Sequence, residues 1–420
     1  MRWILQKLIT CGIFLTVLLS FLANPAPVSI EFADLVLIAL SLGLGVLSLA
    51  SVNHYDATPI EKKLLFAVFL YFSYLLFSGL LGLLQGVPIL NMMRSLGPYI
   101  SFFPLLFLGL LPARIVRINK IALILIAVGL FQIIYLSYLY FTHAEMISNT
   151  ASVLRNRITL MDPRTTLPFL LAVTLLPSIF LFEKNIARIF AICCILLGIL
   201  AGMMTLTRAI LLSMLMGWFV LVGLYVYFQS QLQRFSLSLF LRKISVGLLC
   251  AIILFFMLSL IPKVHLIESG LLARFFDSAA SGHVDYSDGR IYDEWLPALM
   301  RWGQSGWLSI FFGIGAGNTF NVLSGEERTY IHNLTIYSLV YGGIFGLFSC
   351  LWLYFTIFKT LIARAFQSKQ FIYLAYAGLL ASLFFYGQLF AVHKGLAYNV
   401  MLFLIIGVAL IQPTKTLPGR

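Results

Sequence analysis

Three side chains at the borders of long apolar stretches have the chemistry for group transfer. Arg208 interrupts the segment MTLTRAILLSM, Arg290 stands near the start of GRIYDEWLPALMRW, and His332 precedes a long apolar run. A guanidinium group binds phosphate or carboxylate oxygens through paired hydrogen bonds. An imidazole can accept a proton from a hydroxyl group or orient it near neutral pH. These residue types predict anion binding at the two arginines and proton transfer at the histidine.

Each of the three residues also has a purely structural interpretation. Arg208 could extend to lipid headgroups, although the connection around it is so short that a partner within the protein is favoured. Arg290, taken alone, would be a charge on a solvated helix face. His332 would be a polar cap on the apolar helix that follows it. The elements around these residues must therefore decide between the interpretations.

The composition places these elements in a membrane. Of the 420 residues, 61% are hydrophobic and 10% are charged, and the mean hydropathy is +0.99, whereas soluble domains are roughly 25% charged. Apolar runs near the roughly 20 residues that a membrane-crossing helix needs recur along the chain. The sequence predicts an all-α polytopic membrane protein with about twelve transmembrane helices, at 3–24, 30–51, 64–85, 96–112, 120–141, 166–182, 188–206, 209–228, 244–262, 334–358, 371–391 and 395–412.

The distribution of Lys and Arg predicts the orientation. If both termini are cytoplasmic, most of the 28 basic residues fall in short cytoplasmic loops, as the positive-inside rule requires. The basic residues left at the outer face are mostly arginines. Four of them are further candidates for contact with a diphosphate or a glycan: Arg94, Arg155, Arg157 and Arg164.

The chain divides into three parts on this topology. Helices one to nine occupy 1–262, a large outer loop occupies 263–333, and the last three helices occupy 334–420. The loop holds eight of the fifteen acidic residues, so we expect a hydrated, folded insertion. The loop should contain short amphipathic helices, one of them after an N-cap at Ser287 or Asp288, lying on the membrane surface or on the helix bundle. Its apolar stripe is Ile291, Tyr292, Trp295, Leu296, Leu299 and Trp302.

Two further patterns bear on function. The segment GIGAGN at 313–318 predicts a tight turn where the backbone closely approaches another part of the chain. Within the predicted spans the only acidic residues are Glu31 and Asp34, and this scarcity disfavours a proton-coupled or sodium-coupled transporter. The five cysteines all fall in predicted spans, so the sequence predicts neither a disulfide framework nor a Cys-based metal site.

Together, these features resemble the O-antigen ligase and O-antigen polymerase superfamily. His332 and Asn333, followed after nine residues by Gly343 and then by Gly346, match the family's His-Asn/Ser/Gln, x9, Gly-xx-Gly signature. The Thr-Arg-Ala element around Arg208 looks like the family's membrane-edge arginine. The start of the helix at Arg290, the GIGAGN segment and the long loop between helices nine and ten also fit the family's layout.

The resemblance implies a glycosyltransferase in the bacterial inner membrane whose active site faces the periplasm. It would move a glycan from a polyprenyl (undecaprenyl) diphosphate to a sugar hydroxyl of lipid A-core. Arg208 and Arg290 would bind the diphosphate leaving group, and His332 would orient or deprotonate the acceptor hydroxyl, with Asn333 beside it as a substrate-binding residue. The reaction would need no metal, no cofactor and no nucleic acid.

Two alternatives remain open at this stage. A polymerase of the same superfamily would use a second lipid-linked glycan as its acceptor, and the arginines of the 142–165 segment would suit such an enzyme. The motifs do not separate the two acceptors. A membrane transporter or flippase is the other class, but the candidate residues all lie toward one surface rather than at mid-depth.

Overall fold

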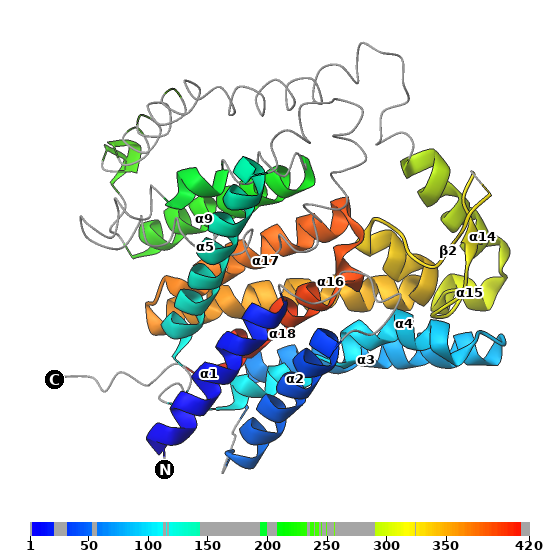
Figure 1. Ribbon diagram of the computed structural model, residues 1–420, viewed down its shortest axis with the longest axis horizontal. Helices are drawn as coiled ribbons and strands as arrows, with labels where there is room; N and C mark the ends of the chain where they lie inside the picture. Colours follow the sequence, from blue (N-terminus) through cyan, green and yellow to red (C-terminus); the bar gives the residue numbers. More distant parts are fainter. Residues whose placement is uncertain are drawn as a thin grey trace. The chain divides into compact units, whose positions relative to one another are not determined.

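The computed structural model describes residues 2–20, 32–52, 57–111, 117–142, 194–199, 208–232, 290–323 and 325–412, with Ile115 and scattered positions between 236 and 256. The described part is mainly helical (Figure 1). Several predictions fall outside it, namely those for Arg155, Arg157, Arg164, Ser287, Asp288 and the span 166–182. The predicted spans 188–206 and 244–262 are described only in part.

The described residues form long helices over the predicted apolar runs and shorter helices outside them. They are α1 (Arg2–Ser20), α2 (Phe32–Ala50), α3 (Pro59–Leu84), α4 (Ile89–Ile100), the 3-10 segment η1 (Phe103–Leu110), α5 (Ile118–Thr142), α9 (Arg208–Gln231), the π-helical turn η4 (Ile291–Trp295), α14 (Leu296–Gln304), α15 (Trp307–Phe312), α16 (Leu334–Ser368), α17 (Ile372–Leu389), the 3-10 turn η5 (Ala391–Lys394) and α18 (Leu396–Leu410). A short antiparallel hairpin joins β1 (Phe320–Asn321) to β2 (Glu327–Arg328), with Phe320 opposite Arg328.

Six helical segments of the described part are long and apolar enough to cross a membrane. They are Trp3–Ser20, Pro59–Leu84, Ile89–Leu110, Ala209–Gln231, Leu334–Ser368 and Ile372–Leu389. This supports the prediction of an all-α membrane protein at the level of class, and the number twelve stays a prediction. Several boundaries differ from the predicted ones. α3 begins at Pro59, because Thr58 and Glu61 form a capping box that extends the helix beyond its apolar part. α4 begins at Ile89, before the predicted span 96–112, which continues as the 3-10 segment η1, and α16 continues to Ser368, beyond the predicted end at 358.

The chain forms two compact units. The first comprises Met1–Ile118, Val284–Ser368 and Phe384–Arg420, and the second comprises Asn119–His283 and Lys369–Leu383. Arg94, Arg290, His332 and Asn333 belong to the first unit, whereas Arg208 belongs to the second.

The central pair of the first unit is α3 and α16, and α16 is broken at Gly343. This residue has φ 64° and ψ −162°, which no helical residue adopts. A break leaves carbonyl groups of the preceding turn without helical partners. Ile314 donates its N–H to the carbonyl of Val340 at 2.8 Å, and the hydroxyl of Ser78 donates to the carbonyl of Tyr341 at 2.7 Å. The break is thus stabilised by hydrogen bonds from α3 and from the loop after α15.

That loop is the GIGAGN segment, and its predicted close approach is confirmed. Gly313, Gly315 and Gly317 have φ of 80°, 82° and 84°, a region that side chains strongly disfavour. A Cβ atom on Gly313 would lie 2.2 Å from the Tyr341 carbonyl carbon, and one on Gly315 would lie 2.6 Å from the Gly82 nitrogen. The glycines therefore let the loop backbone contact α16 and α3 directly.

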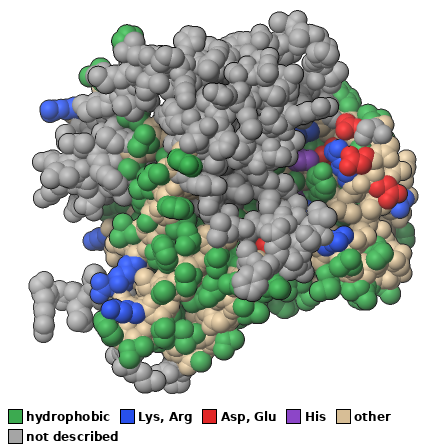
Figure 2. Space-filling view, viewed as in Figure 1, with side chains coloured by type: hydrophobic (Ala, Val, Ile, Leu, Met, Phe, Trp, Pro, Cys, Tyr) green, Lys and Arg blue, Asp and Glu red, His purple; other side chains and the backbone are tan. Residues whose placement is uncertain are grey.

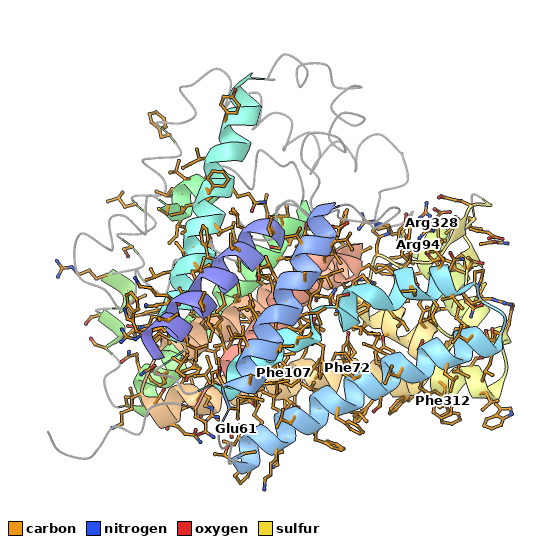
Figure 3. All side chains as sticks on the ribbon, turned by 60° about the horizontal axis from the view of Figure 1, so that its bottom comes forward. Glu61, Phe72, Arg94, Phe107, Phe312 and Arg328 are labelled. Atoms are coloured by element: carbon orange, nitrogen blue, oxygen red, sulfur yellow. The ribbon has the colours of Figure 1, made fainter. Side chains whose placement is uncertain are left out.

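Polar clusters mark the two ends of the α3–α16 pair. At one end the Glu61 carboxylate is buried, pairs with Arg364 and accepts a hydrogen bond from Gln412 at 3.2 Å. At the other end lies the segment 290–333. Figure 3 shows Glu61 at one end of α3, with Arg94 and Arg328 toward the other. The two helices are therefore antiparallel, with apolar lengths between the clusters.

Candidate functional site

The site is built on the helix that runs through η4 and α14, and this predicted helix is confirmed. Its predicted apolar stripe is only partly correct. Ile291 and Tyr292 are exposed, while the most buried residues are Glu294, at 1% exposure, and Ala298. The π-helical turn widens the first part of the helix, and the face that packs inward carries a carboxylate. A carboxylate is rarely buried without partners.

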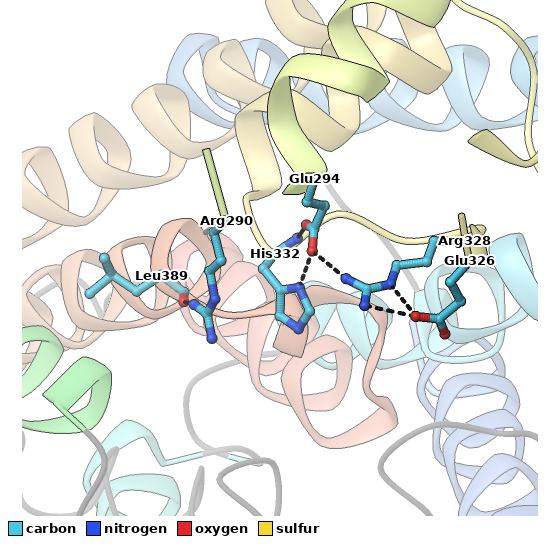
Figure 4. Close-up of polar contacts among 6 residues, drawn as sticks. All are labelled: Arg290, Glu294, Glu326, Arg328, His332 and Leu389. Atoms are coloured by element: carbon cyan, nitrogen blue, oxygen red, sulfur yellow. Dashed lines mark hydrogen bonds and ion pairs between the residues drawn. The ribbon is translucent and has the colours of Figure 1, made fainter. Parts of the chain in front are cut away.

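The partners of Glu294 centre on His332. The carboxylate accepts a hydrogen bond from the backbone N–H of His332 through Oε1, and its Oε2 lies 2.6 Å from Nδ1 of the imidazole (Figure 4). An ionised carboxylate has no proton to donate, so the imidazole donates from Nδ1. Nε2 is then the proton acceptor of the ring. Within the described residues nothing bonds to Nε2, and the side chain is 19% exposed.

An arginine shares the same carboxylate. Arg328, at the end of the hairpin, donates to Oε2 of Glu294 at 3.3 Å and to Oε2 of Glu326 at 2.9 Å. Burial lowers the pKa of Arg328, but the hydrogen bond to Glu326 and the charge interactions with Tyr330, Glu326 and Glu294 together outweigh it, so this pKa lies above its usual value. The hairpin thus closes over Glu294. Leu323 reinforces this by donating its N–H to the carbonyl of Asp293 at 3.2 Å.

Arg290 and His332 rest against the same aromatic ring. The guanidinium carbon of Arg290 is 5.3 Å from the ring centre of Phe390, and the imidazole of His332 meets that ring edge-on at 5.4 Å. Arg290 also donates to the carbonyl of Leu389 at 2.6 Å. The ring centre of Tyr330 lies 5.2 Å from the centre of the His332 imidazole. The structure therefore brings two of the three predicted catalytic residues into one site.

Asn333 has a structural role beside His332. Its Oδ1 accepts the N–H of Ile336 at 2.9 Å and the hydroxyl of Thr335 at 2.7 Å, the geometry of a helix N-cap. Its amide donates to the carbonyl of Gln388 at 3.2 Å. Asn333 thus starts α16 and attaches it to the end of α17. Its predicted contact with substrate stays a prediction.

The 3-10 turn η5 contributes a lysine and a second histidine near these residues. Lys394 donates to the carbonyl of Thr329 at 2.6 Å and lies 5.4 Å from the ring of Tyr337. Burial lowers the pKa of Lys394 to about 7. His393 is fully buried against Tyr337, and burial lowers its pKa as well, so its ring is neutral near pH 7. Lys394 thus fixes the segment after β2 that leads into His332.

The remaining predicted residues are not assembled with His332 by any described contact. Arg94 lies on α4, whose first turn contacts Gly317 of the GIGAGN loop. Arg208 is the first residue of α9 in the second unit, and its side chain lies outside what the structure describes. In the first unit, Figure 2 shows acidic, basic and histidine side chains gathered at one edge, over α14 and β2.

The sequence interpretation missed Glu294, Arg328 and Lys394 as site residues. One signal was available for Glu294, since it follows Arg290 by four residues and so shares its helix face. Nothing local pointed to Arg328 or Lys394. Among the described residues, no group of three His, Cys, Asp or Glu side chains is arranged to hold a metal ion.

The arrangement is chemically a base with an orienting carboxylate. A carboxylate on Nδ1 holds the imidazole in one tautomer and stabilises the imidazolium that forms when Nε2 takes a proton. Arg290, on the neighbouring side of Phe390, supplies a permanent positive charge. Comparison with protein-family models and with curated proteins finds no match.

Proposed function

We propose that this protein is a membrane glycosyltransferase of the O-antigen ligase type. It transfers a glycan from a polyprenyl diphosphate to a sugar hydroxyl of lipid A-core at the periplasmic face of the inner membrane. The observation that carries the proposal is the Glu294–His332 pair beside Arg290, at one end of helices that have the length and composition to cross a membrane.

In this reaction Nε2 of His332 takes the proton of the acceptor hydroxyl as its oxygen bonds to the anomeric carbon. The bond between that carbon and the diphosphate oxygen breaks, and the diphosphate leaves with the electron pair. Arg290 stabilises the charge that grows on the diphosphate. Glu294 stabilises the imidazolium through Nδ1. The sugar–diphosphate bond already stores the energy for transfer, so the reaction consumes no nucleotide.

The position of the site supports a lipid-linked donor. A polyprenyl chain lies in the hydrocarbon and presents its diphosphate at the membrane surface. His332 and Asn333 immediately precede α16, and Arg290 precedes the helix that packs on α16. Cations at the end of apolar helices are suited to a diphosphate at that depth.

The test uses the purified protein in lipid vesicles with a polyprenyl-diphosphate glycan and lipid A-core. We expect glycan on lipid A-core, and we expect His332→Ala and Arg290→Ala each to lose transfer while the protein still inserts. Glu326→Gln is the matched control, because Glu326 is exposed and contacts only Arg328 in this network. Elongation of one lipid-linked glycan by another would identify a polymerase instead. Transfer to neither acceptor, or full activity in both variants, would refute the proposal.

A further inference from the structure

The short helix α15 presents an apolar face to the outside of the protein. Trp307, Leu308 and Phe311 are 69%, 51% and 50% exposed, while Ser309 between them is buried. The helix sequence WLSIFF contains no charged residue. Exposed aromatic and aliphatic side chains clustered in this way mark a surface that another apolar phase covers.

The attachment of α15 shows where that surface lies. Phe312 fits between Phe77 of α3, at 4.8 Å between ring centres, and Phe345 of α16, at 6.3 Å. The backbone of Phe311 and Phe312 passes so close to Gly343 that a Cβ atom there would lie 2.3 Å from the Phe311 carbonyl carbon. Figure 3 shows Phe312 toward the end of α3 that is distant from Glu61. The short helix is thus fixed against the flanks of two helices that can cross a membrane.

The depth of α15 follows from its contact along α3. This helix has 26 residues and is therefore about 39 Å long, against a hydrocarbon thickness of about 30 Å. It carries no charged residue after Lys63. Phe77 lies seven residues before its last residue, Leu84, or about 10 Å along the axis. With α3 centred in the bilayer, Phe77, against which Phe312 packs, lies about 6 Å inside the hydrocarbon boundary. This is within the depth at which interfacial helices bury their apolar face.

The surface of α15 also continues into the outward faces of its neighbours. Leu80 and Leu84 on α3, and Ile344 and Phe348 on α16, are all exposed. A helix that crosses a bilayer presents such side chains to the acyl chains. One occupant that covers all three faces at once is the lipid itself, and Trp307 at the start of α15 suits the headgroup boundary.

We propose that α15 is an interfacial membrane anchor that inserts Trp307, Leu308 and Phe311 into the leaflet on the His332 side. The anchor holds the GIGAGN loop, which follows α15 directly, at the level of the acyl chain boundary. The site above it then lies at headgroup depth. This inference depends on the packing of α15 and not on glycosyl transfer.

The test measures tryptophan fluorescence of the full chain in phosphatidylcholine vesicles, with plain or with brominated acyl chains. The emission of Trp307 is obtained as the difference between the wild-type chain and Trp307→Phe. We expect bromine placed near the headgroup end of the acyl chains to remove most of this emission, and bromine near the methyl end to remove less. Trp302→Phe is the matched control, because the indole N–H of Trp302 donates to Ser309 within the protein.

Three results would overturn the anchor. One is a Trp307 emission that brominated lipid leaves unchanged and aqueous acrylamide quenches. Another is an emission that neither agent quenches in a chain that forms dimers, which would assign the surface to a second copy. The third is stronger quenching by bromine near the methyl end than near the headgroup end. If Trp307→Phe fails to fold, Leu308→Trp reports from the next position, and its added emission must show the same quenching pattern.

Discussion

Replacing Glu294 with glutamine tests whether this carboxylate prepares His332 for proton transfer. Glutamine keeps the size of the side chain, and its oxygen can still accept the backbone N–H of His332. The group that faces Nδ1 becomes an amide NH2, which donates. The imidazole must then accept at Nδ1 and carry its proton on Nε2. The ring keeps its position but loses the acceptor that faces the substrate.

The size of the effect follows from the two contributions that the carboxylate makes. General base catalysis contributes about 10²- to 10⁴-fold, and a carboxylate that fixes the tautomer and stabilises the imidazolium supports nearly all of it. We therefore expect Glu294→Gln to lower kcat by about 10²- to 10⁴-fold, which corresponds to about 3–5 kcal/mol in the barrier. KM for the lipid-linked donor should change little, because Arg290 remains.

The assay is transfer in vesicles, measured over pH for the wild-type chain, Glu294→Gln and Glu326→Gln. Arg328 keeps its hydrogen bonds to Glu326 when Glu294 is replaced, so the variant should fold. Glu326→Gln removes the charge of the other carboxylate that Arg328 contacts and leaves His332 untouched, so its rate should stay close to that of the wild type. A Glu294→Gln chain with a full rate and an unchanged pH profile would show that the carboxylate does not act through His332.

Three further predictions concern stability and need no substrate, and each is read from unfolding in mixed micelles. Gly343→Ala should cost about 1–3 kcal/mol through its positive φ and the crowding by α15. Gly43→Ala, at an open position within α2, should not destabilise the fold. Equal effects of the two substitutions would contradict the break in α16. Glu61→Ala should lower the free energy of unfolding by about 3–5 kcal/mol, because it leaves Arg364 buried without its carboxylate. Replacing both residues with uncharged ones should lower it by less than Glu61→Ala alone. If the effects of the two single substitutions add up in the double variant, the two residues are not coupled. Lys394 has a pKa of about 7 in the folded chain and 10.5 in the unfolded chain, so between these values the unfolded chain binds more protons and stability should rise with pH. Lys394→Met should remove that rise. An unchanged pH profile would show that another group causes the rise.

The positions of the long helices were predictable, because length and apolar composition act locally. The run 334–358 lies within α16, and 209–228 lies within α9. The three glycines of GIGAGN also indicated that the backbone closely approaches another part of the chain, since only glycine tolerates positive φ without strain. Boundaries were less predictable. α3 starts at Pro59 because Thr58 and Glu61 form a cap there, and this cap lies before the apolar run from which the helix was predicted.

The sequence predicted the types of side chain in the candidate site but not the contacts between them. Arg290 and His332 were singled out by type and position, and the structure places both against Phe390. The amphipathic pattern did not indicate that Glu294 faces inward, because a period of 3.6 residues assumes a regular helix and the turn there is π-helical. A carboxylate is assigned to the surface by default until a partner for it is known.

The sequence by itself determined that the protein suits an apolar membrane environment, roughly where its main helices lie, and which residues have side chains suited to group transfer. Only the tertiary structure decided which charges meet. Glu294 and His332 are 38 residues apart in the chain, and Glu61 and Arg364 are 303 apart. Burying a charge is unfavourable until its partner is in place, and that partner arrives only when the helices pack. No local pattern carries this information, because the free energy of each pair belongs to the contact and not to either residue.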